Sequence, residues 1–267
     1  MPDAAPARAN FGLKEEIRAY WSRRAETFDT SSGHGIRTPA ERAAWHDLLG
    51  GLLGPAKGGR VLELAYGTGE VTGVLLDLGC DVTGLDLAEP MQARARAKHA
   101  GRIPPPRLHL GDAEDTREPD ASYDAVVCRH LVWTLTDPAA TFAEWLRVLR
   151  PGGRLVIIDG DWERLTPTGW LFRAGAEIAA CWTGHREPEI DWEAHGRIMR
   201  QVHFRNGVRP HAVRPLLEAA GFTGLRTVSL APVRRAQRRN ADWAVRLRAG
   251  MFLTFGMTAD RPAAPPG

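Results

Sequence analysis

Residues 61–70 read VLELAYGTGE and residues 82–87 read VTGLDL, and these two stretches decide the fold of the chain. The first is an apolar run that carries an acid, passes through a glycine turn and enters a helix. The second is another apolar run, and it ends on Asp86. This order is typical of the nucleotide-binding half of a βαβ unit, in which the glycines let the backbone approach the ligand and the later acid reaches ribose hydroxyls.

Charge around the glycine turn distinguishes between two nucleoside ligands. A dinucleotide needs its pyrophosphate at the helix N-terminus, where Glu70 would repel it and Glu63 adds a second negative charge. Thr72 also stands where the third small residue of G-x-G-x-x-G belongs. S-adenosylmethionine carries a sulfonium and an ammonium and no phosphate, so acids favour it. The sequence therefore predicts S-adenosylmethionine, with S-adenosylhomocysteine as the product.

A motif at the same turn carries a family resemblance. Glu63, Ala65, Gly67 and Gly69 stand in the pattern acid-x-Gly-x-Gly-x-Gly. On these residues the chain resembles the class I S-adenosylmethionine-dependent methyltransferases of the small-molecule type. Ala65 replaces the first glycine, and we expect an ordinary negative φ there.

The alternation of strand and helix patterns predicts a doubly wound α/β fold. Parallel strands are expected near residues 60–65, 81–86, 107–111, 123–129 and 153–159, with helices near 69–79, 88–100 and 138–150. Pro151-Gly152-Gly153 is expected to form a turn before the fifth strand. Further strands are predicted over residues 224–230 and 251–257, with helices over 213–221 and 234–249. The resemblance implies a seven-stranded, mostly parallel, Rossmann-like sheet whose last strand is antiparallel.

We divide the chain into five parts. Residues 1–58 form N-terminal lid helices and a tail, 59–160 the S-adenosylmethionine-binding core, 161–212 a helical cap inserted after strand five, 213–260 the rest of the core sheet, and 261–267 a tail. An insertion after a parallel strand lies at the carboxyl edge, where ligands bind in such sheets. We therefore expect residues 161–212 to cover the substrate.

Four side chains and one backbone group are expected to hold the adenosine. Asp86 is predicted to accept both ribose hydroxyls, the alternative being an N-cap of the next helix. The resemblance implies that Asp112 accepts from the adenine amino group and that the Ala113 N–H meets the ring. Leu87 and Met91 would enclose the adenine, although Met91 also suits a helix core.

The methionine end of the cofactor is assigned to three other residues. Glu63 is expected to orient the ammonium, and Arg129 to offer it a backbone carbonyl. Tyr20 lies in a segment that resembles the family's lid helix, and its hydroxyl could donate to the methionine carboxylate. For Glu63 a hydrogen bond across the turn, and for Tyr20 a core position, are the structural alternatives.

His130 is the candidate general base, because an imidazole has a pKa of about 6.5 and suits proton removal near neutral pH. It follows the fourth strand, the point that faces the methyl group in the resembling family. A helix cap, or packing against Trp133, is the structural alternative. A methyltransferase can also work without a base, since in-line positioning supplies much of the rate.

Aromatic residues and histidines are expected to line the substrate pocket. These are Tyr66, Trp133, Trp182, His185 and Trp192. Cysteines and histidines of the insertion lack the tight spacing of zinc motifs, so no metal is predicted.

Composition fits a globular protein of 267 residues, 43% hydrophobic and 25% charged, with a net charge of +3. No apolar run approaches the length of a membrane span, and a cytoplasmic protein without a membrane partner is expected. The small net charge makes nucleic acid an unlikely partner, and an oligomer is possible but not indicated. The arginines at 234, 235, 238 and 239 are taken as a solvated helix face.

The sequence thus predicts transfer of a methyl group to N or O, less readily C, of a small organic acceptor. The resemblance to the family adds the expectation of a role in specialised metabolism. An RNA or protein methyltransferase is the first alternative. A non-catalytic module that binds the same nucleoside is the second, and a nicotinamide-dependent enzyme the third.

Overall fold

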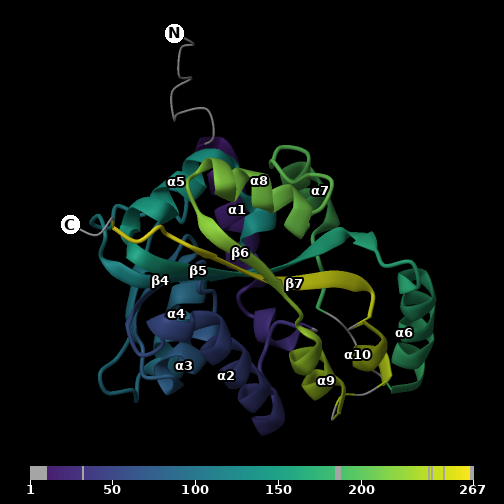
Figure 1. The fold of residues 1–267 in the computed structure, drawn as a ribbon. Helices are drawn as coiled ribbons and strands as arrows, with labels where there is room; N and C mark the ends of the chain where they lie inside the picture. Colours follow the sequence, from purple (N-terminus) through teal and green to yellow (C-terminus); the bar gives the residue numbers. More distant parts are fainter. Residues whose placement is uncertain are drawn as a thin grey trace.

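The protein folds into a seven-stranded sheet with helices on both faces (Figure 1). The structure is a computed structural model, and it describes residues 11–31, 33–183, 188–239, 241, 243–248 and 250–264. The strand order is β3-β2-β1-β4-β5-β7-β6. Strands β1 to β5 pair in parallel, whereas β7 is antiparallel to both β5 and β6. This confirms the predicted doubly wound α/β fold.

The strands are β1 (Arg60–Leu64), β2 (Asp81–Asp86), β3 (Arg107–Leu110), β4 (Tyr123–Arg129), β5 (Leu149–Leu165), β6 (Thr223–Val228) and β7 (Phe252–Asp260). The helices are α1 (Phe11–Arg24), α2 (Pro39–Leu53), α3 (Glu70–Asp77), α4 (Glu89–His99), α5 (Pro138–Val148), α6 (Gly169–Thr183), α7 (Trp192–Met199), α8 (Pro210–Ala219), α9 (Ala231–Arg239) and α10 (Trp243–Arg248).

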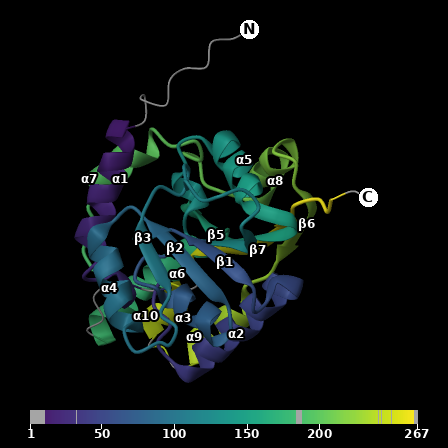
Figure 2. The ribbon, with the colours of Figure 1, turned by 90° about the vertical axis from the view of Figure 1, so that its left-hand side faces the viewer.

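Alternation along the strands divides the core between the two faces of the sheet. Leu62 and Leu64 of β1 pack with α1, α5, α7 and α8, whereas Val61 packs with α2, α3 and α9. Successive side chains of a strand point to opposite faces, and both faces of a parallel sheet are covered. Figures 1 and 2 show the two helical layers on either side of the strands.

The prediction of a turn at Pro151-Gly152-Gly153 was wrong, because β5 begins at Leu149 and runs through it. The pairing with β4 shifts from Tyr123↔Leu149 to Ala125↔Arg154, so the residues in between form a bulge. Gly152, at φ +76°, supplies the backbone conformation that the bulge needs.

Residues expected to form one cap are divided between three places. β5 continues to Leu165 and pairs with Phe252, so it includes the start of the predicted insertion. Helix α7 packs on α1, and ion pairs join Arg23 to Asp191 (3.3 Å) and Arg197 to Glu16 (2.8 Å). Helix α6 packs on α10, away from α7 (Figure 1). No helix of the described residues is long and apolar enough to cross a bilayer.

Candidate functional site

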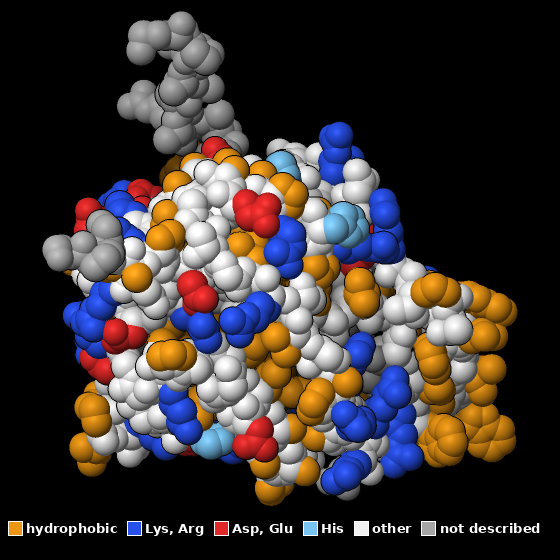
Figure 3. All heavy atoms as spheres, in the orientation of Figure 1, with side chains coloured by type: hydrophobic (Ala, Val, Ile, Leu, Met, Phe, Trp, Pro, Cys, Tyr) orange, Lys and Arg blue, Asp and Glu red, His pale blue; other side chains and the backbone are white. Residues whose placement is uncertain are grey.

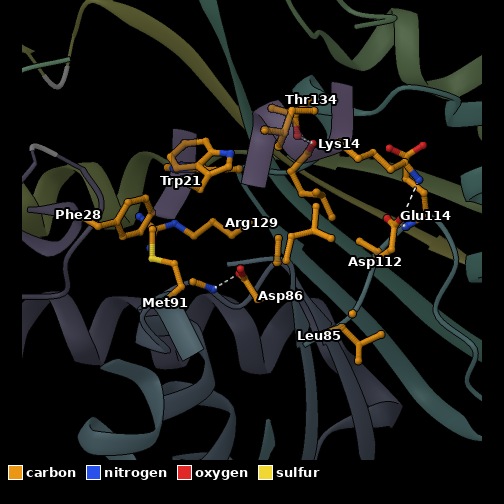
Figure 4. A pocket seen from close by; sticks show the side chains of 18 residues that line it. Lys14, Trp21, Phe28, Leu85, Asp86, Met91, Asp112, Glu114, Arg129 and Thr134 are labelled. Atoms are coloured by element: carbon orange, nitrogen blue, oxygen red, sulfur yellow. Dashed lines mark hydrogen bonds and ion pairs between the residues drawn. The ribbon is translucent and has the colours of Figure 1, made fainter. Parts of the chain in front are cut away.

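A cavity of about 780 Å³, including its open mouth, lies at the carboxyl edge of the sheet. The ends of β1 to β4 form its floor and walls, and α1 covers it (Figure 4). Its lining is Lys14, Ile17, Trp21, Phe28, Ala65, Gly67, Leu85, Asp86, Leu87, Met91, Gly111, Asp112, Ala113, Glu114, Arg129, His130, Leu131 and Thr134.

The cavity brings together most of the residues predicted to bind the cofactor. They come from four separate loops, which meet because the carboxyl ends of parallel strands share one edge. Those in the lining are Ala65, Gly67, Asp86, Leu87, Met91, Asp112, Ala113 and Arg129, and the candidate base His130 lines the same cavity.

The backbone of the glycine turn is left-handed at three positions. Gly67 and Gly69 have φ values of +56° and +81°. A Cβ atom on Gly69 would lie 2.8 Å from Nε2 of His99, so this position has no room for a side chain. The expectation of a negative φ at Ala65 was wrong, because its φ is +52°. An L-residue in this conformation costs about 1–2 kcal/mol relative to glycine.

Asp86 faces the cavity from the end of β2 and is held by two backbone donors. The N–H groups of Gly67 and Ala88 each donate to one carboxylate oxygen at 2.8 Å. Burial raises the pKa of Asp86 to about 6, and the two N–H donors only partly offset it. A carboxylate has about four lone-pair sites, so two remain for hydroxyl donors in the cavity.

Asp112 and Ala113 form the wall after β3. The Lys14 ammonium of α1 pairs with the Asp112 carboxylate, which also accepts from the Glu114 N–H at 2.9 Å. The Trp145 Nε1 donates to the Ala113 carbonyl at 2.8 Å and fixes this turn from the core side. The Lys14–Asp112 pair ties α1 across the cavity.

Aromatic rings close the cavity on the side of α1. The Trp21 and Phe28 rings lie 5.9 Å apart in a T-shaped arrangement, and both pack against the cluster of Ala25, Ala88 and Met91. Figure 4 shows the two rings on the same side of the cavity as Met91. Met91 is therefore both a core residue of α4 and part of the lining, which joins the two roles considered for it.

The Arg129 side chain holds the loop before α2 against the end of β4. Its guanidinium donates to the carbonyls of His34 (2.9 Å) and Gly33, and it stacks on Trp45 with its central carbon 4.7 Å from the ring centroid. Burial lowers the pKa of Arg129 to about 10, still well above neutrality. The guanidinium is therefore a fixed positive charge beside the cavity.

His130 lines the cavity in a left-handed conformation, at φ +59°. Its ring contacts those of His34 (5.2 Å between centroids) and Trp162 (4.9 Å). Burial, assisted by the nearby charges of Arg129 and His34, holds the pKa of His130 well below its ordinary value. The imidazole is therefore neutral at physiological pH, and its lowered pKa makes it a weaker base than an unburied histidine.

Three residues assigned to the cofactor site lie outside the lining. Glu63 is buried and accepts from the Thr72 hydroxyl at 2.6 Å, and burial raises its pKa to about 8. Tyr20 is buried against Trp21 and accepts from Arg24 at 3.3 Å. Gly69 borders a second, polar cavity at the start of α3. These placements match the structural alternatives considered for Glu63 and Tyr20.

Tyr66 points away from the cavity, contrary to the prediction that it contacts substrate. Its ring lies over Gly84, where a Cβ atom would be 2.6 Å from the Tyr66 Cδ1. It packs with Ala95 and Leu108, and its hydroxyl donates to the His109 carbonyl at 3.4 Å. The missing side chain at Gly84 makes room for the ring.

The other aromatic substrate candidates also lie outside the lining. Trp133 is buried behind Trp21, 6.1 Å from it, and donates to the His130 carbonyl at 3.0 Å. Trp182 and Trp192 are 87% and 68% exposed, because they project from the outer faces of α6 and α7. His185 lies outside the described residues.

Glu70 was expected to place negative charge at the cofactor, but it does not line the cofactor cavity. Its carboxylate pairs with Lys98 and accepts from the Ile36 N–H at 2.7 Å, outside the cofactor cavity. The carboxylates in the cavity lining are instead those of Asp86, Asp112 and Glu114, and Asp112 is paired with Lys14.

Several lining residues were not predicted as site residues. Glu114, Leu131 and Thr134 follow β3 and β4 by a few residues, so their place at the carboxyl edge was the available signal. Lys14 stands one turn before Ile17 on α1, and helical spacing could have found it. Within the described part of the chain, no cluster of three or more His, Cys, Asp or Glu could hold a metal ion.

Comparison with known proteins agrees with this geometry. Residues 62–157 match the family described as "Methyltransferase domain". A phosphatidylethanolamine N-methyltransferase of Cereibacter sphaeroides is 37% identical over 134 residues, which is 49% of this chain and 62%, less than two thirds, of that protein. An uncharacterized methyltransferase of Mycobacterium tuberculosis is 34% identical over 170 residues, 63% of this chain and 67% of that protein.

Two solved structures share the fold at low sequence identity. Geranyl diphosphate C-methyltransferase from Streptomyces coelicolor A3(2), in complex with S-adenosyl-L-homocysteine, has a TM-score of 0.60 and 18% identity, with 97% of this chain and 100% of that chain covered. The [4+2]-cyclase SpnF has a TM-score of 0.61 and 17% identity, with 94% and 97% covered. The motif, the fold and the sequence relatives together show that the chain belongs to the class I S-adenosylmethionine-dependent methyltransferases.

Proposed function

We propose that the protein transfers the methyl group of S-adenosylmethionine to a nitrogen or oxygen atom, less readily carbon, of a small organic acceptor in specialised metabolism. The observation that carries this proposal is the continuity of the cavity. One lining runs from the carboxylates of Asp86 and Asp112 to the imidazole of His130, under the aromatic cover of α1.

The lining fits the chemistry of S-adenosylmethionine. Asp86 keeps acceptor sites for ribose hydroxyls, and Leu87 and Met91 offer apolar surface to a purine. Acidic side chains at the cavity suit a cationic methionine moiety. The bound cofactor supplies a methyl group on a sulfonium, which is an activated leaving group. The protein then needs chiefly to align the acceptor, to exclude water and, for a hydroxyl, to remove a proton.

His130 is the residue that we assign to proton removal. Its neutral imidazole lines the cavity, so one ring nitrogen can accept a hydrogen bond from an acceptor hydroxyl, and the ring packs against Trp162 and His34. A phenol or alcohol would gain from this base, whereas an amine only needs to arrive unprotonated. The relatives named as a phosphatidylethanolamine N-methyltransferase and as O-methyltransferase cnsE of Penicillium expansum do not agree on one acceptor atom.

The test is turnover with panels of small amines, phenols and alcohols, measured as release of S-adenosylhomocysteine and located by mass spectrometry of the product. We expect methylation of a small-molecule panel and none of bulk RNA or denatured protein. Methylation of RNA or protein alone would replace the proposal by the first alternative. Cofactor binding without turnover on any panel would favour the non-catalytic module.

A further inference from the structure

One face of α6 is apolar and exposed to solvent. Trp170, Leu171, Ile178 and Trp182 are 62%, 53%, 63% and 87% exposed. On α10, Trp243 is 67% exposed. Figure 3 shows the apolar side chains gathered over α6 at one end of the molecule. Exposed apolar residues that cluster in this way mark a contact surface.

A different side of α6 accounts for its attachment to the protein. Ala176 is 1% exposed, and a Cβ atom on Gly175 would lie 3.2 Å from Leu247 of α10. Small residues on this side let α10 pack closely. Core packing therefore explains the inner face of the helix and leaves the outer tryptophans unexplained.

Positive charge borders the apolar face. Helices α9 and α10 hold six arginines and no acidic residue, and Asp242 between them lies outside the described residues. Arg235 and Arg246 donate to the backbone carbonyls of Ala231 and Ala241, contacts that leave their charge in place. Figure 3 shows Lys and Arg side chains beside the apolar group.

The geometry points to an anionic bilayer surface as the partner of the α6–α10 face. Tryptophan favours the boundary between acyl chains and headgroups, and arginines beside it attract anionic headgroups. A second copy fits less well, because a two-fold contact through this face would oppose the two arginine clusters. No membrane partner was expected from the sequence, but surface binding requires no spanning helix.

The face also lies at the functional edge of the sheet. β5 ends at Leu165 and α6 begins at Gly169, so the α6–α10 face comes after the carboxyl end of β5. The carboxyl ends of the neighbouring strands β1 to β4 form the cofactor cavity. The inference does not depend on the proposed acceptor, since vesicle binding can be measured without turnover.

Cosedimentation of the full chain with vesicles tests the inference. We expect binding to vesicles of phosphatidylglycerol and phosphatidylcholine in equal parts, weakened by salt, and little binding to phosphatidylcholine alone. The variant Trp170→Ser/Leu171→Ser/Ile178→Ser should bind at least tenfold more weakly. Arg235→Gln/Arg239→Gln should lose about fivefold for each arginine.

Matched controls keep the outcome interpretable. Ile103→Ser removes an apolar side chain that is 97% exposed between α4 and β3, and Arg117→Gln/Arg226→Gln makes the same change of net charge elsewhere. Both should bind vesicles like the wild type, and every variant should bind S-adenosylhomocysteine normally, which shows that it is folded. Failure to bind anionic vesicles, or equal losses in the controls, would overturn the inference. A dimer in light scattering that the α6 variant converts to monomer would identify the face as a subunit interface instead.

Discussion

The substitution Asp86→Asn separates cofactor binding from folding, because the two effects on stability oppose each other. Burial raises the pKa of Asp86 from 3.8 to about 6, so keeping it ionised at about pH 7.5 costs the folded state about 3 kcal/mol. The amide removes that cost. It retains one acceptor oxygen, however, so one of the bonds from Gly67 and Ala88 is lost, at about 1.5–3 kcal/mol. We expect the free energy of unfolding to change by less than about 1.5 kcal/mol.

The effect of Asp86→Asn on cofactor affinity, unlike its effect on stability, is not offset by a second effect of opposite sign. Ribose hydroxyls that donate to a carboxylate form charge-assisted hydrogen bonds, and losing them costs about 1–3 kcal/mol, or about 5- to 150-fold in Kd. Isothermal titration with S-adenosylhomocysteine measures the affinity, and urea denaturation the stability. Unchanged affinity in a folded Asp86→Asn protein would refute the ribose assignment.

The pH dependence supplies a second readout on the same residue. The cofactor needs the ionised carboxylate, so wild-type affinity should be complete above about pH 7, fall about twofold at about pH 6 and fall about tenfold by about pH 5. The raised pKa means that the folded chain holds this proton more tightly than the unfolded chain. As the pH rises from about 4 to about 6, ionisation of Asp86 therefore lowers the free energy of unfolding. Above that range this loss of stability stays constant. The Asp86→Asn variant should show neither pH effect at this residue.

Asp161→Asn is the matched control. Asp161 is buried on the same sheet edge, accepts from Arg209 Nε at 2.6 Å, and does not line the cavity. Weakening a buried ion pair should lower the free energy of unfolding, while the Kd for S-adenosylhomocysteine stays at the wild-type value.

Three further variants test other parts of the site. His130→Asn should lower kcat about 100-fold with a hydroxyl acceptor and leave cofactor affinity unchanged; an unaltered pH–rate profile would make His130 structural. Ala65→Gly should raise the free energy of unfolding by about 0.5–1 kcal/mol, measured in urea, because relief of the positive φ exceeds the added chain entropy. Arg129→Lys should lower the thermal midpoint, since an ammonium cannot reproduce the two bonds and the stacking on Trp45; an unchanged midpoint would show that the loop is held otherwise.

The fold and the cofactor half of the site could be predicted from the sequence because both depend on local order. Strand, turn and helix follow one another within about twenty residues, and parallel strands then bring Asp86, Asp112 and His130 to one edge. The bulge at Gly152 was not predictable in this way. A Pro-Gly-Gly stretch favours a turn and a strand bulge equally well, and pairing with β4 decides between them.

The substrate residues depend on long-range packing, which periodicity does not record. Tyr66 points away from the cavity because Gly84 of the neighbouring strand leaves space for its ring. Trp182 and Trp192 were assigned to a pocket because they lie in the insertion expected to cover the substrate, but both lie on outer helix faces. Ala65 shows the same limit for the backbone, since the turn imposes its positive φ despite the side chain.

Calorimetric titration of the purified wild-type protein with S-adenosylhomocysteine, with NAD and NADP in parallel, tests the central claim most directly. The arrangement of Asp86, Asp112 and the glycine turn predicts low-micromolar binding of S-adenosylhomocysteine and none of either dinucleotide. Binding of a dinucleotide alone would contradict the assignment of the cavity to a methyl donor.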